Sequence, residues 1–193
     1  QVMRLKEDDE VTLVFDDGIK RLARVWDVEN RQFELVEELA DNVELPVQVT
    51  IASGFPKGDK LEFITQKVTE LGASQIWAFP AEWSVAKWDG KKLGKKVEKL
   101  EKIALGAAEQ SKRNVVPSIH LFESKADFLV QLDQFDSIIV AYEESAKEGE
   151  SAALLQAVSG LEKGAKLLFI FGPEGGLSPA EIESFEAKGS VLA

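Results

Sequence analysis

The stretch "KLLFIFGPEGGLSPAEI", residues 166–182, constrains the fold of this chain more than any other. Its continuous apolar run predicts a buried strand, because a strand covered on both faces needs no alternation with polar residues. The glycines that follow end the strand. "SPAE" then predicts a helix with Ser178 as N-cap, Pro179 as first helical residue and Glu181 as partner in a capping box. A strand, a glycine loop and a capped helix in this order are typical of an α/β protein.

The chain after Pro46 repeats this alternation of strands and helices. Apolar runs predict buried strands, and apolar residues at helical spacing predict amphipathic helices between them. The alternation predicts a mostly parallel sheet with helices on both faces. Strands are expected at residues 47–53, 75–80, 118–122, 135–144 and 165–172, and helices over 57–72 and 91–112, near 125–132 and 151–161, and from 178 onward.

The segment before Pro46 has a different character. Short β-type runs are separated by turn residues, and the Asp-Gly pair at Asp17 and Gly18 is a strong hairpin signal. A small antiparallel β-domain or barrel is expected here. Residues 40–46 read as a linker, which predicts two domains, over residues 1–42 and 43–193.

The composition limits the classes of protein. The 193 residues are 45% hydrophobic and 30% charged, which is typical of a soluble globular protein. No run resembles a membrane span or a secretory leader, so a cytoplasmic location without membrane association is expected. The chain has no cysteine and one histidine, His120, which excludes disulfides, thiolate metal sites and a histidine-based metal cluster, and no metal is expected. His120 lies in an apolar run and is interpreted as structural.

The net charge of −11 disfavours binding to a polyanion over the whole surface. The local distribution differs, since residues 85–113 contain nine basic and four acidic side chains, which gives a local charge of +5. The lysines of residues 91–102 alternate with Glu98 and Glu101, a pattern most often found on a solvated helix face.

The glycine loop of residues 172–176 is expected where ligands bind in open α/β sheets, beyond the carboxyl ends of the strands. Its glycines let a backbone approach a ligand closely. "GPEGG" matches neither the phosphate-binding P-loop nor the G-x-G-x-x-G motif, which disfavours a nucleoside triphosphate. Glu174 favours a ligand with positive charge and hydrogen-bonding edges. A tight turn in which the glycines serve geometry alone is the alternative interpretation.

The segment "GPEGGLSPAEI" resembles the signature of the RsmE family, the bacterial 16S ribosomal RNA (uracil-N3)-methyltransferases of the knotted SPOUT superfamily. Four further segments resemble the family in the same order and cover nearly the whole chain. They are "VMRLKEDDEV" at residues 2–11, "QKVTELGA" at 66–73, "SVAKW" at 84–88 and "AAEQSKRNVVP" at 107–117.

The resemblance implies a PUA-like β-barrel followed by an α/β SPOUT methyltransferase domain with a deep trefoil knot, working as a homodimer. It also implies S-adenosylmethionine as cofactor, bound by the glycine loop and by the neighbouring strand end. The residues carried over to this pocket are Ala141, Tyr142, Glu143, Gly172, Pro173, Glu174, Gly175 and Gly176.

The resemblance further implies 16S ribosomal RNA, or the small ribosomal subunit, as partner. Because uracil N3 lies on the pairing edge, the base must be unpaired or flipped to react. Arg113 is the candidate to stabilise negative charge developing on the uracil, and no residue stands out as a general base. Trp83 and Trp88 are open between stacking on RNA and packing in a core. The expected RNA-binding residues are Arg4, Lys6, Arg24, Lys87, Lys112 and Arg113, the last three expected at the same sheet end as the glycine loop.

Two features depart from the family pattern. The chain ends in "KGSVLA", where the family continues into a segment that completes the knot, so a missing knot segment and a missing N-terminal strand are expected. "SVLA" is a candidate part of the final helix, joined across a gap in the sequence. Trp83 replaces the arginine more common in the family. A non-catalytic RNA-binding or ribosome-assembly protein and a small-metabolite-binding domain are the alternative functions.

Overall fold

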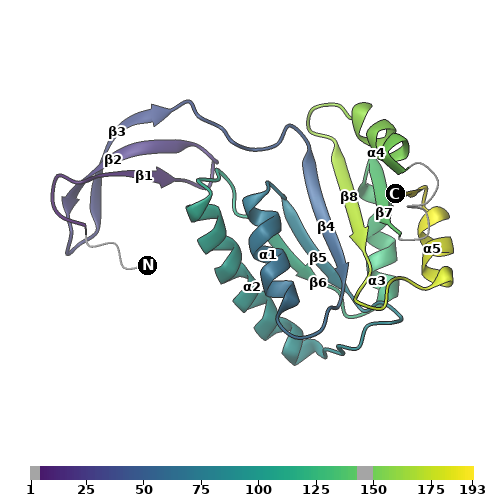
Figure 1. Cartoon of the computed structure of the whole chain (residues 1–193). Coiled ribbons are helices and arrows are strands. Elements are labelled where there is room, and N and C mark those ends of the chain that lie inside the picture. The colour runs from purple at the N-terminus through teal and green to yellow at the C-terminus, as the bar shows by residue number, and fades with distance from the viewer. Residues whose placement is uncertain (1–4, 143–149) are drawn as a thin grey trace. The chain divides into compact units, whose positions relative to one another are not determined.

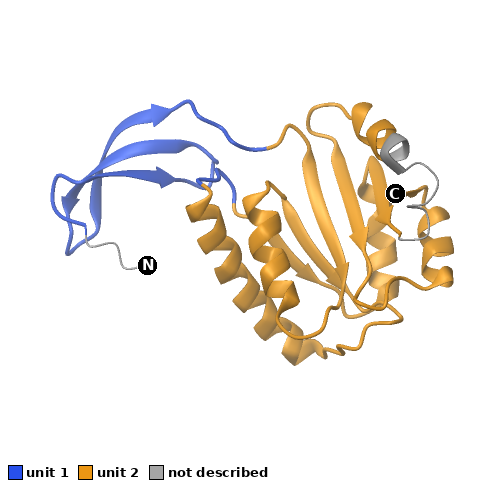
Figure 2. Cartoon of the chain, viewed as in Figure 1, with its two compact units in different colours: residues 1–44, 112–115 blue, residues 45–111, 116–193 orange. Residues whose placement is uncertain are grey.

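The computed structural model describes residues 5–142 and 150–193 of the chain, with side chains from 154 onward in the second range. Arg4 and Glu143, both predicted site residues, lie outside the described residues. The chain forms two compact units (Figure 2). The first unit comprises residues 1–44 with 112–115, and the second comprises residues 45–111 with 116–193.

The first unit contains a three-stranded antiparallel sheet in the order β1-β2-β3 (Figure 1). Its strands are β1 (Glu10–Val14), β2 (Lys20–Asp27) and β3 (Gln32–Leu39). The predicted hairpin is confirmed, since Val14 pairs with Lys20 and the turn contains Gly18 at a φ of +72°. The described strands form an open sheet and do not close into a barrel.

Residues 112–115 belong to the first unit because they bind the segment that follows β3. Glu44 accepts hydrogen bonds from the backbone N–H groups of Asn114 at 2.8 Å and Val115 at 3.1 Å, and it pairs with Arg113. Asn114 Nδ2 donates to the carbonyl oxygen of Gly18 at 2.9 Å. The predicted domain boundary between residues 42 and 43 did not include this return of the chain to the first unit at residues 112–115.

The second unit contains a six-stranded sheet in the order β6-β5-β4-β8-β7-β9, in which every pair is parallel. The predicted α/β fold with a parallel sheet is therefore confirmed. Its strands are β4 (Gln48–Gly54), β5 (Gln75–Phe79), β6 (Ser118–Leu121), β7 (Ser137–Ala141), β8 (Lys166–Phe171) and β9 (Val191–Leu192). Its helices are α1 (Lys60–Glu70), α2 (Gly90–Gln110), α3 (Lys125–Val130), the 3-10 helix η1 (Gln131–Gln134), α4 (Glu150–Ser159) and α5 (Pro179–Glu186).

The two faces of this sheet carry separate hydrophobic cores. Helices α1 and α2 cover one face, and α3, α4 and α5 lie on the other (Figure 1). Successive side chains of strand β5 point to opposite faces of the sheet and so contribute to both cores. Trp77 and Phe79 pack with Phe128 and Phe185, while Ala78 packs on the opposite side. Coverage of both faces explains why these strands are apolar throughout, as the sequence indicated.

The expectation that residues 190–193 belong to the final helix is wrong. Gly189 adopts a φ of +81° after α5, a conformation that ends the helix. The chain then pairs as β9 with β7, where the N–H of Ala193 donates to the carbonyl oxygen of Val140 at 2.9 Å. The N–H of Tyr142 donates in turn to the carbonyl oxygen of Ala193 at 2.9 Å.

Helices in the described ranges are all too short or too polar to cross a lipid bilayer.

Candidate functional site

The carboxyl edge of the parallel sheet has a topological switch point between β4 and β8. The connection after β4 leads through α1 to β5 on one side, and the connection after β8 leads through α5 to β9 on the other. The two loops therefore diverge from adjacent strands. Open α/β sheets bind ligands at such a point, which is where the glycine loop of residues 172–176 begins.

The glycine loop is a tight turn packed against the end of β4. The N–H of Gly176, at a φ of +78°, donates to the carbonyl oxygen of Pro173 at 2.8 Å. A Cβ atom on Gly172 would lie 2.7 Å from the carbonyl carbon of Gly176, and one on Gly54 would lie 2.5 Å from Cδ of Pro173. Glycine is therefore required at 54 by contact with the rigid ring of Pro173 and at 172 by contact with backbone, whereas the space beside Gly176 is open.

The end of β7 lies beside this loop. Ala141 is paired with Phe171, the residue before Gly172. Tyr142 follows, half-buried against the core that α5 helps to form. The structure thus brings together Ala141 and Tyr142 and the glycine loop, as the sequence indicated.

Glu174 is held by a neighbouring loop rather than left free for a ligand. Its carboxylate lies 2.7 Å from Nζ of Lys60 and accepts a hydrogen bond from the N–H of Lys57 at 3.0 Å. The hydrogen bond from Lys60, with the backbone N–H groups of Glu174 and Lys57, lowers the pKa of Glu174 to about 2. Because Lys60 already balances its charge, Glu174 attracts a cationic ligand less than the sequence suggested.

The amino end of α5 ties the glycine loop to the loop after β5. The predicted capping box is present, with Ser178 N–H donating to Oε2 of Glu181 at 3.0 Å. The other oxygen of Glu181, a fully buried side chain, accepts from the N–H of Glu82 at 2.8 Å and lies 3.7 Å from Nζ of Lys125. Ser178 Oγ donates to Oε2 of Glu82 at 2.6 Å. Sequence reasoning found the cap but missed Glu82 and Lys125, since nothing local links residues so far apart.

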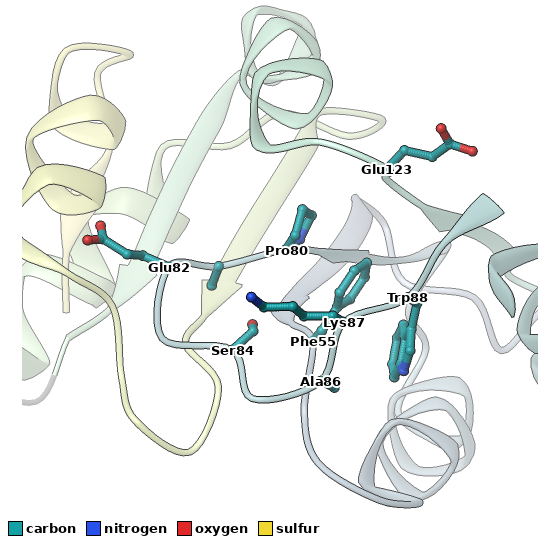
Figure 3. A pocket seen from close by; sticks show the side chains of 9 residues that line it. Phe55, Pro80, Glu82, Ser84, Ala86, Lys87, Trp88 and Glu123 are labelled. Carbon is teal, nitrogen blue, oxygen red and sulfur yellow. The ribbon is translucent and has the colours of Figure 1, made fainter.

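A pocket of about 260 Å³ lies between the ends of β4, β5 and β6 (Figure 3). Phe55 and Trp88 pack together at its wall with ring centroids 4.3 Å apart, and the Lys87 side chain runs across it. Oγ of Ser84 is buried there without a hydrogen-bond partner in the described structure. The lining residues are Phe55, Pro80, Ala81, Glu82, Ser84, Ala86, Lys87, Trp88 and Glu123.

The expected position of Arg113 is wrong. Lys112 and Arg113 precede the amino end of β6, whereas the glycine loop follows the carboxyl end of β8, so the topology does not place them at one sheet end. Arg113 is buried and its Nε donates to Oε1 of Glu44 at 3.1 Å. Burial alone would raise the pKa of Glu44, but the hydrogen bonds from Arg113, Asn114 and Val115 outweigh it and lower that pKa. Arg113 is thus a buried partner of Glu44, and this burial does not favour its predicted roles in catalysis and RNA contact.

The other predicted RNA-binding residues that the structure describes are exposed. Lys6 and Arg24 lie in the first unit, where Arg24 is 3.6 Å from Glu10. Lys112 is exposed at a φ of +55°, and Lys87 lines the pocket. Of these residues Lys87 belongs to the second unit, where it lies at the glycine-loop end of the sheet.

The lysines of α2 fit the interpretation of a solvated face. Lys99 pairs with Glu62 at 2.6 Å and Lys92 lies 3.8 Å from Asp89, all on exposed or half-exposed side chains. His120 is exposed on the edge strand β6, with its ring 4.2 Å from that of Phe122. Within residues 5–142 and 150–193, no group of three or more histidine or acidic side chains could hold a metal ion.

Two family models match the chain. One, described as an RNA methyltransferase domain, matches residues 43–192, and the other, described as an RNA methyltransferase PUA domain, matches residues 1–38. The chain is 46% identical over 192 residues to ribosomal RNA small subunit methyltransferase E of Bacillus subtilis (strain 168), with 98% of this chain and 75% of that protein covered. It is 30% identical over 156 residues to the protein of that name from Mesomycoplasma hyopneumoniae, with 81% of this chain and 64% of the relative covered.

Solved structures share the fold. A crystal structure described as a hypothetical protein superposes with a TM-score of 0.88 at 43% identity, covering 100% of this chain and 76% of that chain. Ribosomal RNA small subunit methyltransferase E from Neisseria gonorrhoeae, bound to S-adenosyl methionine, superposes with a TM-score of 0.76 at 24% identity, covering 100% and 77%. At 24% identity, the similarity to the Neisseria gonorrhoeae structure supports the fold alone.

Proposed function

The chain belongs to the RNA methyltransferase family that includes ribosomal RNA small subunit methyltransferase E, and we propose that it transfers a methyl group from S-adenosylmethionine to N3 of a uridine in 16S ribosomal RNA. The observation that carries the proposal is the glycine loop at the switch point of a parallel sheet, next to a pocket that holds a lysine. The homodimer, the trefoil knot and the cytoplasmic location stay predictions from the resemblance.

The residues at the glycine loop fit the cofactor. Open space lies beside Gly176, where the backbone can approach a ligand without side-chain interference. The loop would contact the cofactor together with Ala141 and Tyr142, which the register of β7 and β8 places next to it. When bound, S-adenosylmethionine supplies an electrophilic methyl group on a sulfonium.

The pocket supports a role for Lys87 in the reaction. Uracil must lose its N3 proton for N3 to act as a nucleophile, and the resulting negative charge spreads onto O2 and O4. An ammonium group in contact with either oxygen would stabilise that charge. Lys87 is the lysine that lines the pocket, and its side chain runs across it (Figure 3). We therefore assign to Lys87 the stabilising role that the sequence suggested for Arg113.

Cofactor binding tests the glycine loop through a matched pair of substitutions. Gly172→Ala places a Cβ 2.7 Å from backbone, whereas Gly94→Ala, in α2, meets open space. In calorimetric titrations with S-adenosylmethionine we expect Gly172→Ala to lose at least tenfold in affinity and Gly94→Ala to bind like the wild type. If both variants are folded by circular dichroism and bind S-adenosylmethionine with equal affinity, the glycine loop is not part of the cofactor site.

Methyl transfer tests Lys87. Lys87→Met keeps most of the side-chain volume but removes the charge, and we expect kcat to fall about 10²-fold, because a donor to developing negative charge makes a contribution of that order. Lys95→Met, an exposed lysine of α2 outside the pocket, is the control and should keep wild-type kcat. A wild-type rate in Lys87→Met would refute this role.

A further inference from the structure

Trp83 is an exposed aromatic residue at the carboxyl edge of the sheet. It lies in the loop between β5 and α2, next to the glycine loop, and its side chain is 47% exposed. A Cβ atom on Gly175 would lie 3.2 Å from Cβ of Trp83, which shows how closely the two loops approach. Trp83 therefore belongs to the loop that lines the pocket and lies where that loop meets the glycine loop.

The backbone on both sides of Trp83 is fixed. The N–H of Ser84 donates to the carbonyl oxygen of Ala81 at 3.0 Å, which closes a turn around Trp83. The preceding residue, Glu82, is held at its N–H by the buried Glu181 and at its carboxylate by Ser178. The indole is thus presented from a turn that is ordered before any ligand arrives, which lowers the entropy cost of binding.

The chemistry around Trp83 favours a nucleobase over a phosphate. Lys87 is the one basic residue among the described residues that line the adjacent pocket, so they offer no cluster of basic side chains to bind the phosphate backbone. The other tryptophan of this loop, Trp88, packs against Phe55 and lies under Nζ of Lys96, 4.3 Å from its ring centroid, so it has little ring face left for stacking. Stacking on an exposed ring suits every base, since each base has a π-face.

We propose that Trp83 is a stacking platform for an unpaired nucleobase of the RNA substrate. The proposal rests on the proposed function, which supplies RNA as the partner. It adds a contact through which the loop between β5 and α2 holds the RNA next to the glycine loop. Glu181 and Ser178 are the residues that position the platform.

Three variants test the platform. Trp83→Ala removes the ring, Trp83→Phe keeps a smaller one, and Phe63→Ala removes an exposed aromatic from α1 as a control. Binding of a fluorescently labelled 16S ribosomal RNA transcript is measured by anisotropy at one fixed salt concentration, without cofactor. We expect Trp83→Ala to weaken RNA binding about tenfold, as for the loss of one stacked base, Trp83→Phe to restore most of the affinity, and Phe63→Ala to bind like the wild type.

Affinity for S-adenosylmethionine and the thermal midpoint should be the same in all three variants as in the wild type. Wild-type RNA affinity in Trp83→Ala, an equal loss in Phe63→Ala, or a change of oligomeric state in Trp83→Ala without a loss of RNA affinity would overturn the platform. The last result would make Trp83 an interface residue between copies of the chain.

The same proteins separate this inference from the proposed function. RNA binding that depends on Trp83, in a protein that transfers no methyl group, would support the platform and refute the enzyme. Methyl transfer that is indifferent to Trp83 would support the enzyme and refute the platform. A wild-type protein that binds no 16S transcript would overturn both.

Discussion

At the scale of single residues, the site depends on where side chains are absent and on which charges are already paired. Gly54 and Gly172 are needed because Pro173 and the backbone of Gly176, respectively, occupy the space of their Cβ atoms. Glu174 looked from the sequence like a partner for a cationic ligand, but the structure pairs it with Lys60. That pairing could not be predicted, because the loop carrying Lys57 and Lys60 meets the glycine loop only through the fold.

The ion pair of Glu174 gives a prediction about pH. Its pKa of about 2 lies below the ordinary value of 4.5. The ionised carboxylate therefore stabilises the fold fully above about pH 4.5, and this contribution is lost as the pH falls toward 2. We expect the carboxyl carbon of Glu174 to titrate near pH 2 in NMR spectra, and Lys60→Met to move that midpoint up toward 4.5.

Lys99→Met serves as the control for that titration, since Lys99 pairs with Glu62 rather than with a residue of the glycine loop. It should leave the midpoint of Glu174 unchanged. A wild-type midpoint near 4.5, or no response to Lys60→Met, would show that the pair does not hold Glu174 in solution.

At the scale of elements, local patterns predicted the helices and strands that carry strong periodicity. Helix α2 was expected over 91–112 and spans Gly90–Gln110, and the cap of α5 at Ser178 was correct because capping chemistry is local. Strand β9 was not predicted, since a strand of two residues is too short to show a hydrophobic periodicity and forms only by pairing with β7 in the sheet. The sequence also could not show that Glu181, besides capping its own helix, accepts a hydrogen bond from Glu82.

The predicted position of Arg113 was wrong because of the helix that precedes it. Clustering of basic residues along the chain suggested one binding surface, yet α2 separates Lys87 from Lys112 and Arg113 by 21 helical residues. An α-helix carries the chain back from the carboxyl to the amino end of a parallel sheet. Of the three, only Lys87 is therefore in the pocket beside the glycine loop.

At the scale of the whole molecule, the chain combines an antiparallel sheet with a parallel α/β sheet, and the two family models cover the same two parts. Composition alone would have disfavoured RNA, given a net charge of −11. The acidic composition is compatible with RNA binding if the affinity for RNA comes from a few contacts, such as Lys87 and the ring of Trp83, rather than from the overall charge of the protein.

The central claim is that the chain is a methyltransferase acting on uridine N3, and it is tested most directly by methyl transfer followed by nucleoside analysis. Purified protein is incubated with methyl-labelled S-adenosylmethionine and 16S ribosomal RNA or small subunits that lack the modification, and the RNA is digested for mass spectrometry. We predict one labelled product, N3-methyluridine, formed by the wild type and strongly reduced in Gly172→Ala. Label in another nucleoside would contradict the assignment to N3, and cofactor binding without any labelled nucleoside would contradict the enzyme and favour a non-catalytic RNA-binding protein.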